Sequence, residues 1–195
     1  MALTLQKQQS ISLAKTAGSS LTSISLGLGW DPVKAGGFLG KMFGGGAEID
    51  LDASCILLNS DYQKIDLVWF RQLKSQDGSI KHSGDNRTGE GDGDDETINV
   101  DLQRLPASVK YLIFTVNSFT GQTFEKVEKA YCRIVNGSNN NELARFNLSD
   151  KGGHTGIVMA SLTRENGDWE FKAIGKTTNG RTADDLITLA VQALR

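Results

Sequence analysis

Short stretches rich in β-branched and aromatic residues recur along this chain, and clusters of Gly, Asn, Asp and Ser separate them. This pattern is typical of the strands and turns of an all-β sandwich. The sequence therefore predicts a two-sheet β-sandwich with few helices. The clearest candidate strands span residues 21–28, 49–58, 65–73, 97–102, 110–119, 130–135, 142–148, 155–163 and 168–174.

Two dipeptides predict hairpins, because both tolerate the positive φ that tight turns require. Asp77-Gly78 lies between the run 68–70 and Ile80, and Asn166-Gly167 lies between the segments 157–163 and 169–173. We therefore expect each pair of flanking segments to form antiparallel neighbours.

The C-terminal segment has a different period. Thr182 precedes Asp185 by three residues, which is the spacing of a helix capping box. Apolar residues then recur at helical spacing, at Leu186, Ile187, Ala190, Val191 and Leu194. The pattern predicts one amphipathic helix that covers an open face or end of the sandwich.

Length and composition fit a single domain over residues 1–195, with 38% hydrophobic and 23% charged residues. A net charge of -2 argues against a protein that binds nucleic acid through a basic face.

The longest apolar runs have four residues, such as Tyr111 to Phe114, so no membrane span is expected. The N-terminus lacks a secretory signal, which predicts a cytoplasmic protein. Cys55 and Cys132 lie in strand-like runs and are expected to be buried free thiols.

A long acidic loop is the strongest chemical signal. Residues 85–96 hold six carboxylates and one Arg, a local charge of -5, and glycines alternate with the acids. Calcium takes six to eight oxygen ligands in irregular geometry, so this loop suits a calcium ion. The helix-loop-helix calcium motif does not fit, because Arg87, Gly89 and Glu90 occupy positions 3, 5 and 6 of its frame. We therefore expect a loop site on a β scaffold.

A second acidic element precedes this loop. Asp50 and Asp52 alternate with Leu51 and Ala53, so in a strand both carboxylates would project from one face and could share a cation. Asp31, at the end of an earlier candidate strand, could complete such a site. A solvated strand face or an acidic turn without metal remains the alternative interpretation.

Other functional patterns are weaker. His82 lies three residues before Asp85 and could act as a base beside a metal-bound water in a metal-dependent hydrolase, but a lone histidine at a strand end is more often simply hydrogen-bonded. The single Arg residues along the strands have the normal pattern of solvated strand faces. The segment Gly36–Gly46 carries Phe38, Leu39, Met42 and Phe43 among glycines, and either tucks these side chains back or presents them to a partner or membrane surface.

Several segments together resemble the TerD family of tellurite-resistance and stress proteins. They are 27–31 (GLGWD), 49–54 (IDLDAS), the 84–96 loop (GDNRTGEGDGDDE), 114–118 (FTVNS) and 153–156 (GHTG). The order and spacing match over essentially the whole chain. The resemblance implies a β-sandwich of the bacterial cytoplasm that binds two neighbouring calcium ions. The family's acidic residues carry over to Asp31, Asp50, Asp52, Asp85, Asn86, Asp92, Asp94, Asp95 and Glu96.

The resemblance also implies a role alongside other tellurite-resistance proteins, including partners at the inner face of the membrane. We expect a non-enzymatic, calcium-binding protein whose loop order or surface charge changes when calcium binds, and which thereby engages partners. A metal-dependent hydrolase that uses the same acids is the alternative. A calcium-dependent sugar-binding sandwich is a third candidate, and the missing secretion signal argues against it.

Overall fold

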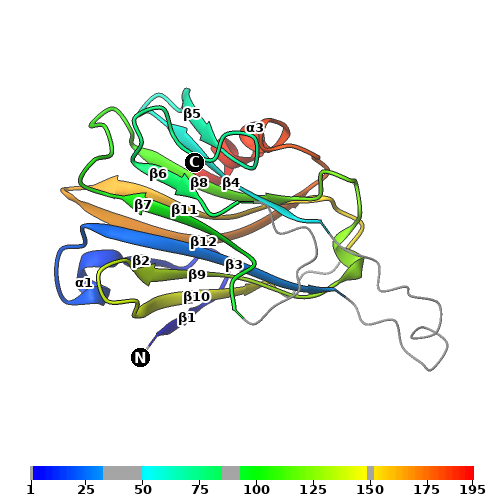
Figure 1. Ribbon diagram of the computed structural model, residues 1–195, viewed down its shortest axis with the longest axis horizontal. Coiled ribbons are helices and arrows are strands. Elements are labelled where there is room, and N and C mark those ends of the chain that lie inside the picture. Colours follow the sequence, from blue (N-terminus) through cyan, green and yellow to red (C-terminus); the bar gives the residue numbers. More distant parts are fainter. Residues whose placement is uncertain (1, 33–49, 85–92, 149–151) are drawn as a thin grey trace.

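In a computed structural model of the chain, residues 2–32, 50–84, 93–148 and 152–195 are described. The described strands form two six-stranded sheets that stack on each other (Figure 1). The first sheet, called sheet A, has the order β1-β10-β9-β3-β7-β6. Its strands are β1 (Leu3–Leu5), β3 (Ser23–Pro32), β6 (Ile80–His82), β7 (Glu96–Asp101), β9 (Val127–Asn136) and β10 (Glu142–Leu148).

The second sheet, sheet B, has the order β2-β12-β11-β8-β4-β5. Its strands are β2 (Ser10–Ser12), β4 (Asp52–Leu58), β5 (Lys64–Val68), β8 (Tyr111–Asn117), β11 (Gly156–Glu165) and β12 (Asp168–Thr178). The pairing of β1 with β10 is parallel, and the other described pairs are antiparallel. The predicted all-β, two-sheet sandwich is therefore confirmed.

Alternating side chains of sheet B separate two apolar clusters. On β8, Leu112, Phe114 and Val116 belong to the main core between the sheets. Ile113 of the same strand belongs instead to a second cluster on the opposite face, beneath the C-terminal helix. This division follows from the period of two in a strand, and it defines an inner and an outer face of sheet B.

The C-terminal helix, α3 (Ala183–Leu194), begins where the sequence predicts. The Thr182 side chain accepts a hydrogen bond from the Asp185 backbone N–H, and the Asp185 side chain accepts one from the Thr182 backbone N–H. Leu194, Ala190 and Ile187 pack with the second cluster on sheet B. The helix thus covers the outer face of sheet B, as expected (Figure 1). Within the described residues no helix is long and apolar enough to cross a membrane.

The predicted hairpins have different outcomes. Asn166 (φ 48°) and Gly167 (φ 84°) adopt the left-handed conformation between β11 and β12, which confirms that hairpin. Gly78 (φ 76°) also turns a short hairpin, in which Lys74 pairs with Lys81 and the Ser75 backbone N–H donates to Ile80 O over 3.0 Å. The turn is therefore confirmed, but the predicted partner segment 68–70 is wrong. Ile80 belongs to β6, which pairs with β7 in sheet A, whereas β5 lies in sheet B. The chain therefore crosses between the sheets before this turn, between the end of β5 at Val68 and Lys74.

Two short helical elements have no counterpart in the sequence prediction. They are α1 (Leu13–Ala17) and the 3-10 turn η1 (Phe124–Lys126). Both cysteines are buried and free, as predicted. Burial raises the pKa of the Cys132 thiol to about 12, so this thiol is protonated at neutral pH and is a poor nucleophile.

Candidate metal site

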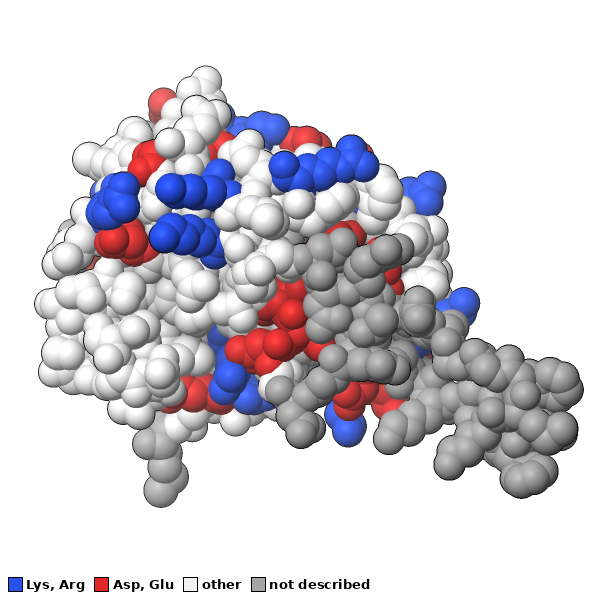
Figure 2. All heavy atoms as spheres, viewed as in Figure 1, with Lys and Arg blue, Asp and Glu red and all other residues white. Residues whose placement is uncertain are grey.

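Asp95 lies at the centre of the described acidic residues, immediately before β7. Its backbone N–H donates to Leu28 O over 2.8 Å, and its Oδ2 accepts the Trp30 backbone N–H over 2.7 Å. Both bonds join Asp95 to β3, so its carboxylate is held beside Asp31, the residue that follows Trp30. Figure 2 shows acidic side chains gathered in the middle of this face of the molecule.

The electrostatics at Asp95 favour a bound cation. Partial burial raises the pKa of the Asp95 carboxyl above its ordinary value, and the negative charges of Asp31, Glu96 and Asp94 raise it further, while the hydrogen bond from Trp30 acts in the opposite direction. A pKa raised by neighbouring carboxylates means that the ionised cluster repels itself. A cation among these oxygens would remove that repulsion.

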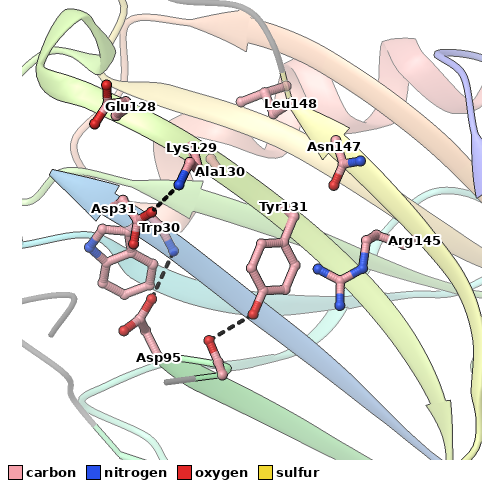
Figure 3. A pocket seen from close by; sticks show the side chains of 11 residues that line it. Trp30, Asp31, Asp95, Glu128, Lys129, Ala130, Tyr131, Arg145, Asn147 and Leu148 are labelled. Carbon is pink, nitrogen blue, oxygen red and sulfur yellow. Dashed lines mark hydrogen bonds and ion pairs between the residues drawn. The ribbon is translucent and has the colours of Figure 1, made fainter. Parts of the chain in front are cut away.

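A cavity gives access to two of these carboxylates. Its volume is about 440 Å³, and Asp31 and Asp95 line one end while Tyr131 and Arg145 line the other (Figure 3). The Asp31 side chain is half exposed, and its Oδ2 lies 3.2 Å from Lys129 Nζ. An exposed pair of this kind contributes little to stability, so Asp31 can exchange Lys129 for another cation at low cost.

Glu96 joins the two sheets. It begins β7 with a fully buried side chain that points into the sandwich, and its Oε2 accepts the Ala53 backbone N–H of β4 over 2.7 Å. His82 Nε2 lies 3.4 Å from the same oxygen and 3.1 Å from Ala53 O. Glu96 is therefore anchored by the scaffold.

Both ring nitrogens of His82 are occupied. The Gly84 backbone N–H donates to Nδ1 over 3.0 Å, so Nδ1 carries no proton and Nε2 is the donor toward Ala53 O. The side chain is fully buried. This arrangement favours the structural interpretation of His82, because neither nitrogen faces solvent where a general base would meet a substrate.

Asp94 projects to the outer face of sheet A. Its carboxylate accepts hydrogen bonds from Arg133 Nε and Nη2 over 2.8 Å and 3.0 Å, and from the Tyr131 hydroxyl over 3.0 Å. Burial and the Asp94 charge raise the pKa of Tyr131 to about 12, so its hydroxyl stays protonated as a donor. Asp94 is thus engaged by a cation of the protein itself.

Arg133 and Arg145 belong to a network that the sequence did not indicate. The prediction of solvated single arginines is wrong for them: Glu142 accepts from both, over 3.1 Å and 2.9 Å, and the Arg145 guanidinium carbon lies 4.2 Å from the Tyr131 ring centroid. The sequence signal that could have indicated this network is the pair Gly27 and Gly29, which leave space on one face of β3. In the structure the register places them opposite Arg133 and Tyr131 of β9.

Asp52 belongs to sheet B, and Asp50 precedes its strand β4 by two residues. Asp52 begins β4, and its side chain lies on the same face of the strand as those of Ile56 and Leu58, which pack on the outer face of sheet B. The Asp50 backbone N–H donates to Gln122 Oε1 over 3.4 Å. Asp52 thus belongs to sheet B, whereas Asp31 belongs to β3 of sheet A.

The predicted ligands Asp85, Asn86 and Asp92, and the segment Gly36–Gly46, lie outside the described residues. Among the described residues, no three Asp, Glu, His or Cys side chains converge closely enough to hold a metal ion by themselves. The donor chemistry, oxygen from several carboxylates, fits calcium. Asp31 and Asp95 are the described pair best placed to contribute to such a site.

Comparison with known proteins decides the family. The family model of the TerD domain matches residues 1–189. The chain belongs to the TerD family. It is 55% identical over 192 residues to the tellurium resistance protein TerZ of Serratia marcescens, covering 98% of both chains. It is 40% identical to the stress response protein SCP2 of Bacillus subtilis, covering 96% of this chain and 98% of that one.

Within the TerD family, the Gly-rich insertion around Phe38 to Phe43 and the segment 117–119 make the chain resemble TerZ, and the identity confirms that resemblance. A solved structure supports the fold. A homologue of the telluride resistance protein TerD from Streptomyces coelicolor aligns with a TM-score of 0.66 and 24% identity, covering 86% of this chain and 96% of that one.

Proposed function

We propose that this TerD-family protein binds calcium at the acidic end of the sandwich and acts without catalysis in a tellurite-resistance and stress response. The observation that carries the proposal is Asp95, a partly buried carboxylate whose pKa is raised by burial and by the charges of Asp31, Glu96 and Asp94. Calcium would neutralise this cluster, and the change in charge and loop order would govern binding to partners.

The proposed cellular setting is the bacterial cytoplasm. The partners would be other tellurite-resistance proteins, some of them at the inner face of the membrane. The names of TerZ and SCP2, which the chain resembles along almost its whole length, support a role in resistance and stress. Two calcium ions are proposed, in keeping with the resemblance to the TerD family and with the number of acidic residues that the sequence offers.

The test is calcium titration by calorimetry on metal-stripped protein, followed by thermal melts with calcium or magnesium. At a free calcium concentration of 100 times Kd, one site should add about 2.7 kcal/mol of stability. Asp95→Asn should weaken binding at least tenfold. Asp61→Asn is the matched control, because Asp61 is an exposed residue after β4, at the opposite end of that strand from Asp52. No heat and no melting shift in the wild type would refute the calcium site.

The hydrolase alternative requires a base, and His82 is the residue that the sequence offers. Its two hydrogen-bonded nitrogens and buried ring argue for a structural role. His82→Gln separates the two functions. Calcium affinity and tellurite resistance that survive this substitution in a folded protein would leave the hydrolase without its base, whereas loss of resistance with intact calcium binding and stability would favour it.

A further inference from the structure

Three aromatic rings lie around the Arg71 guanidinium, next to β5 at one edge of sheet B (Figure 1). Its carbon Cζ lies 5.5 Å from the ring centroid of Trp69 and 5.2 Å from the centroids of Phe70 and Phe119. The Phe70 ring packs edge-on against the other two, with its centroid 5.0 Å from Trp69 and 5.7 Å from Phe119. A cation this close to aromatic rings is attracted to them, so the rings hold the guanidinium. We call these four residues the Arg71 cluster.

A short turn fixes the part of the cluster that follows β5. The Trp69 backbone N–H donates to Gln72 O over 3.1 Å, and the Gln72 backbone N–H donates to Trp69 O over 2.9 Å. The side-chain Nε2 of Gln72 donates to Asp66 Oδ1 of β5 over 2.9 Å. Trp69 itself packs against the second apolar cluster on the outer face of sheet B. Arg71 is therefore presented from a rigid turn, which lowers the conformational cost of binding a partner.

Phe119 supplies the third ring from the segment that follows β8. Its carbonyl oxygen accepts a hydrogen bond from Arg181 Nε over 3.2 Å, just before α3. Phe119 is 38% exposed, and Leu73, two residues after Arg71, is 45% exposed. The surface around the cation is therefore apolar and accessible to a partner.

The Arg71 charge is not compensated by the part of the protein that the structure describes. Arg71 is exposed, and among the described residues no carboxylate forms an ion pair with it and no acceptor takes a hydrogen bond from it. Arg133, by contrast, is paired with the carboxylates of Asp94 and Glu142. An arginine carries five N–H donors in a planar fork that matches a carboxylate. The cluster thus offers a fixed cation to an anionic group.

The composition of the cluster favours a protein partner over a membrane. Trp and Arg are enriched among the residues that dominate the binding energy of protein interfaces. Anionic membranes, in contrast, are recognised by clusters of about four to eight Lys or Arg. In the Arg71 cluster one guanidinium is set among packed rings, and Trp69 is held by the second apolar cluster instead of projecting outward.

We propose that the Arg71 cluster docks an acidic segment of a partner protein. An Asp or Glu carboxylate of the partner binds the Arg71 guanidinium, and a neighbouring apolar side chain of the partner packs on Phe119 and Leu73. Charge complementarity carries this assignment, because a carboxylate satisfies the donors that the described protein leaves without an acceptor. The proposed calcium function names no docking surface, and none of these residues is among the predicted calcium ligands.

The test titrates isotope-labelled protein in EDTA with a model peptide, acetyl-Gly-Phe-Asp-Leu-Gly-amide, and follows the amide signals by NMR. EDTA removes calcium, so the result is independent of the calcium site. The signals of residues 69–73 and 118–120 should move as the peptide binds. The matched peptide with Asn in place of Asp should bind about tenfold more weakly, because a hydrogen bond between charged groups contributes more than one to a neutral amide.

Arg71→Gln should weaken binding of the Asp peptide about tenfold and abolish the preference for Asp over Asn. Arg195→Gln is the matched control, because Arg195 is also exposed and its Cζ lies 5.0 Å from the ring centroid of Tyr62. Tyr62 lies between β4 and β5, at the other end of β5 from Trp69, so this variant should keep the full affinity. Phe119→Ala provides a second variant should Arg71→Gln fail to fold. It should weaken binding of both peptides by the same factor, because it removes apolar surface and no charge.

Three results would overturn the proposal. The Asp peptide could leave the signals of the Arg71 cluster unchanged. The two peptides could bind equally tightly to the wild type, or Arg71→Gln could keep the preference for Asp. The wild type could instead sediment with vesicles of phosphatidylcholine and phosphatidylglycerol but not with phosphatidylcholine alone. Loss of that sedimentation in Arg71→Gln would identify an anionic membrane as the occupant.

Discussion

Glu96 Oε2 of β7 accepts the backbone N–H of Ala53 on β4 over 2.7 Å, so a single carboxylate connects the two sheets at the acidic end. The bond is fully buried, and His82 Nε2 lies 3.4 Å from the same oxygen. Glu96 thus fixes the spacing between the strand that follows the acidic loop and the strand that carries Asp52. This connection gives the candidate metal site a rigid inner wall.

Glu96→Ala should destabilise the fold, because it leaves the Ala53 N–H buried without an acceptor. The cost of such an unsatisfied donor is about 1–3 kcal/mol, beyond that of the lost packing. Glu96→Gln keeps an acceptor oxygen and should cost less. Urea denaturation at pH 7 in EDTA measures both changes. Equal stability of Glu96→Ala and wild type would contradict a structural role for this bond.

The raised pKa of Asp95 predicts a pH dependence of stability in metal-free protein. A carboxyl whose pKa is higher in the folded state than its ordinary value of 3.8 stabilises the fold when protonated. This contribution is complete below the unfolded-state pKa and is lost as pH rises through the folded-state pKa. Melting temperature against pH, in EDTA, should therefore show a smaller loss over the window just above pH 3.8 for Asp95→Asn than for wild type.

Calcium should remove the same pH effect, because a bound cation keeps the carboxylate ionised at no electrostatic cost. The wild type melted in saturating calcium should thus be stabilised most at the upper side of that pH window. Identical pH profiles for Asp95→Asn and wild type in EDTA would show that Asp95 does not titrate as proposed.

Much of the fold could be predicted from the sequence. The longer strands follow from runs of β-branched residues, and α3 follows from Thr182 and Asp185 at capping-box spacing. The strands β1, β2 and β6 have three residues each, too few to show a period. The sheet to which β5 and β6 belong depends on pairing with distant strands, which local pattern does not encode.

The sequence singled out the acidic residues beside β7 but not the directions of their side chains. Asp94 and Glu96 are two residues apart, a spacing that would place both side chains on one face of a regular strand. Because β7 begins only at Glu96, Asp94 lies outside that period and reaches Arg133 on the outer face of sheet A, whereas Glu96 points between the sheets to Ala53. A count of carboxylates in the loop could not separate these roles, since Arg133 is 39 residues away in sequence from Asp94.

Gly29→Ala should be destabilising because its Cβ would overlap the Tyr131 ring. That ring cannot easily move, since its hydroxyl donates to Gly93 O over 2.7 Å and Arg145 covers its face. Overpacking of this kind costs about 1–3 kcal/mol. In a double-mutant cycle, Tyr131→Ala should relieve most of the Gly29→Ala penalty. Additive effects in urea denaturation would contradict a direct contact.

Asp94→Asn and Asp95→Asn should affect calcium binding differently, although the residues are adjacent. The Asp94 carboxylate is held by Arg133, with a shortest bond of 2.8 Å, and the opposing charge raises the pKa of Arg133. We therefore expect calcium affinity in Asp94→Asn to stay within about threefold of wild type, with a stability loss of about 1 kcal/mol from the weakened ion pair. Asp95→Asn should lose at least tenfold in affinity. Calorimetric titration of both variants measures the difference, and an equal loss in the two would mean that calcium displaces Arg133 from Asp94.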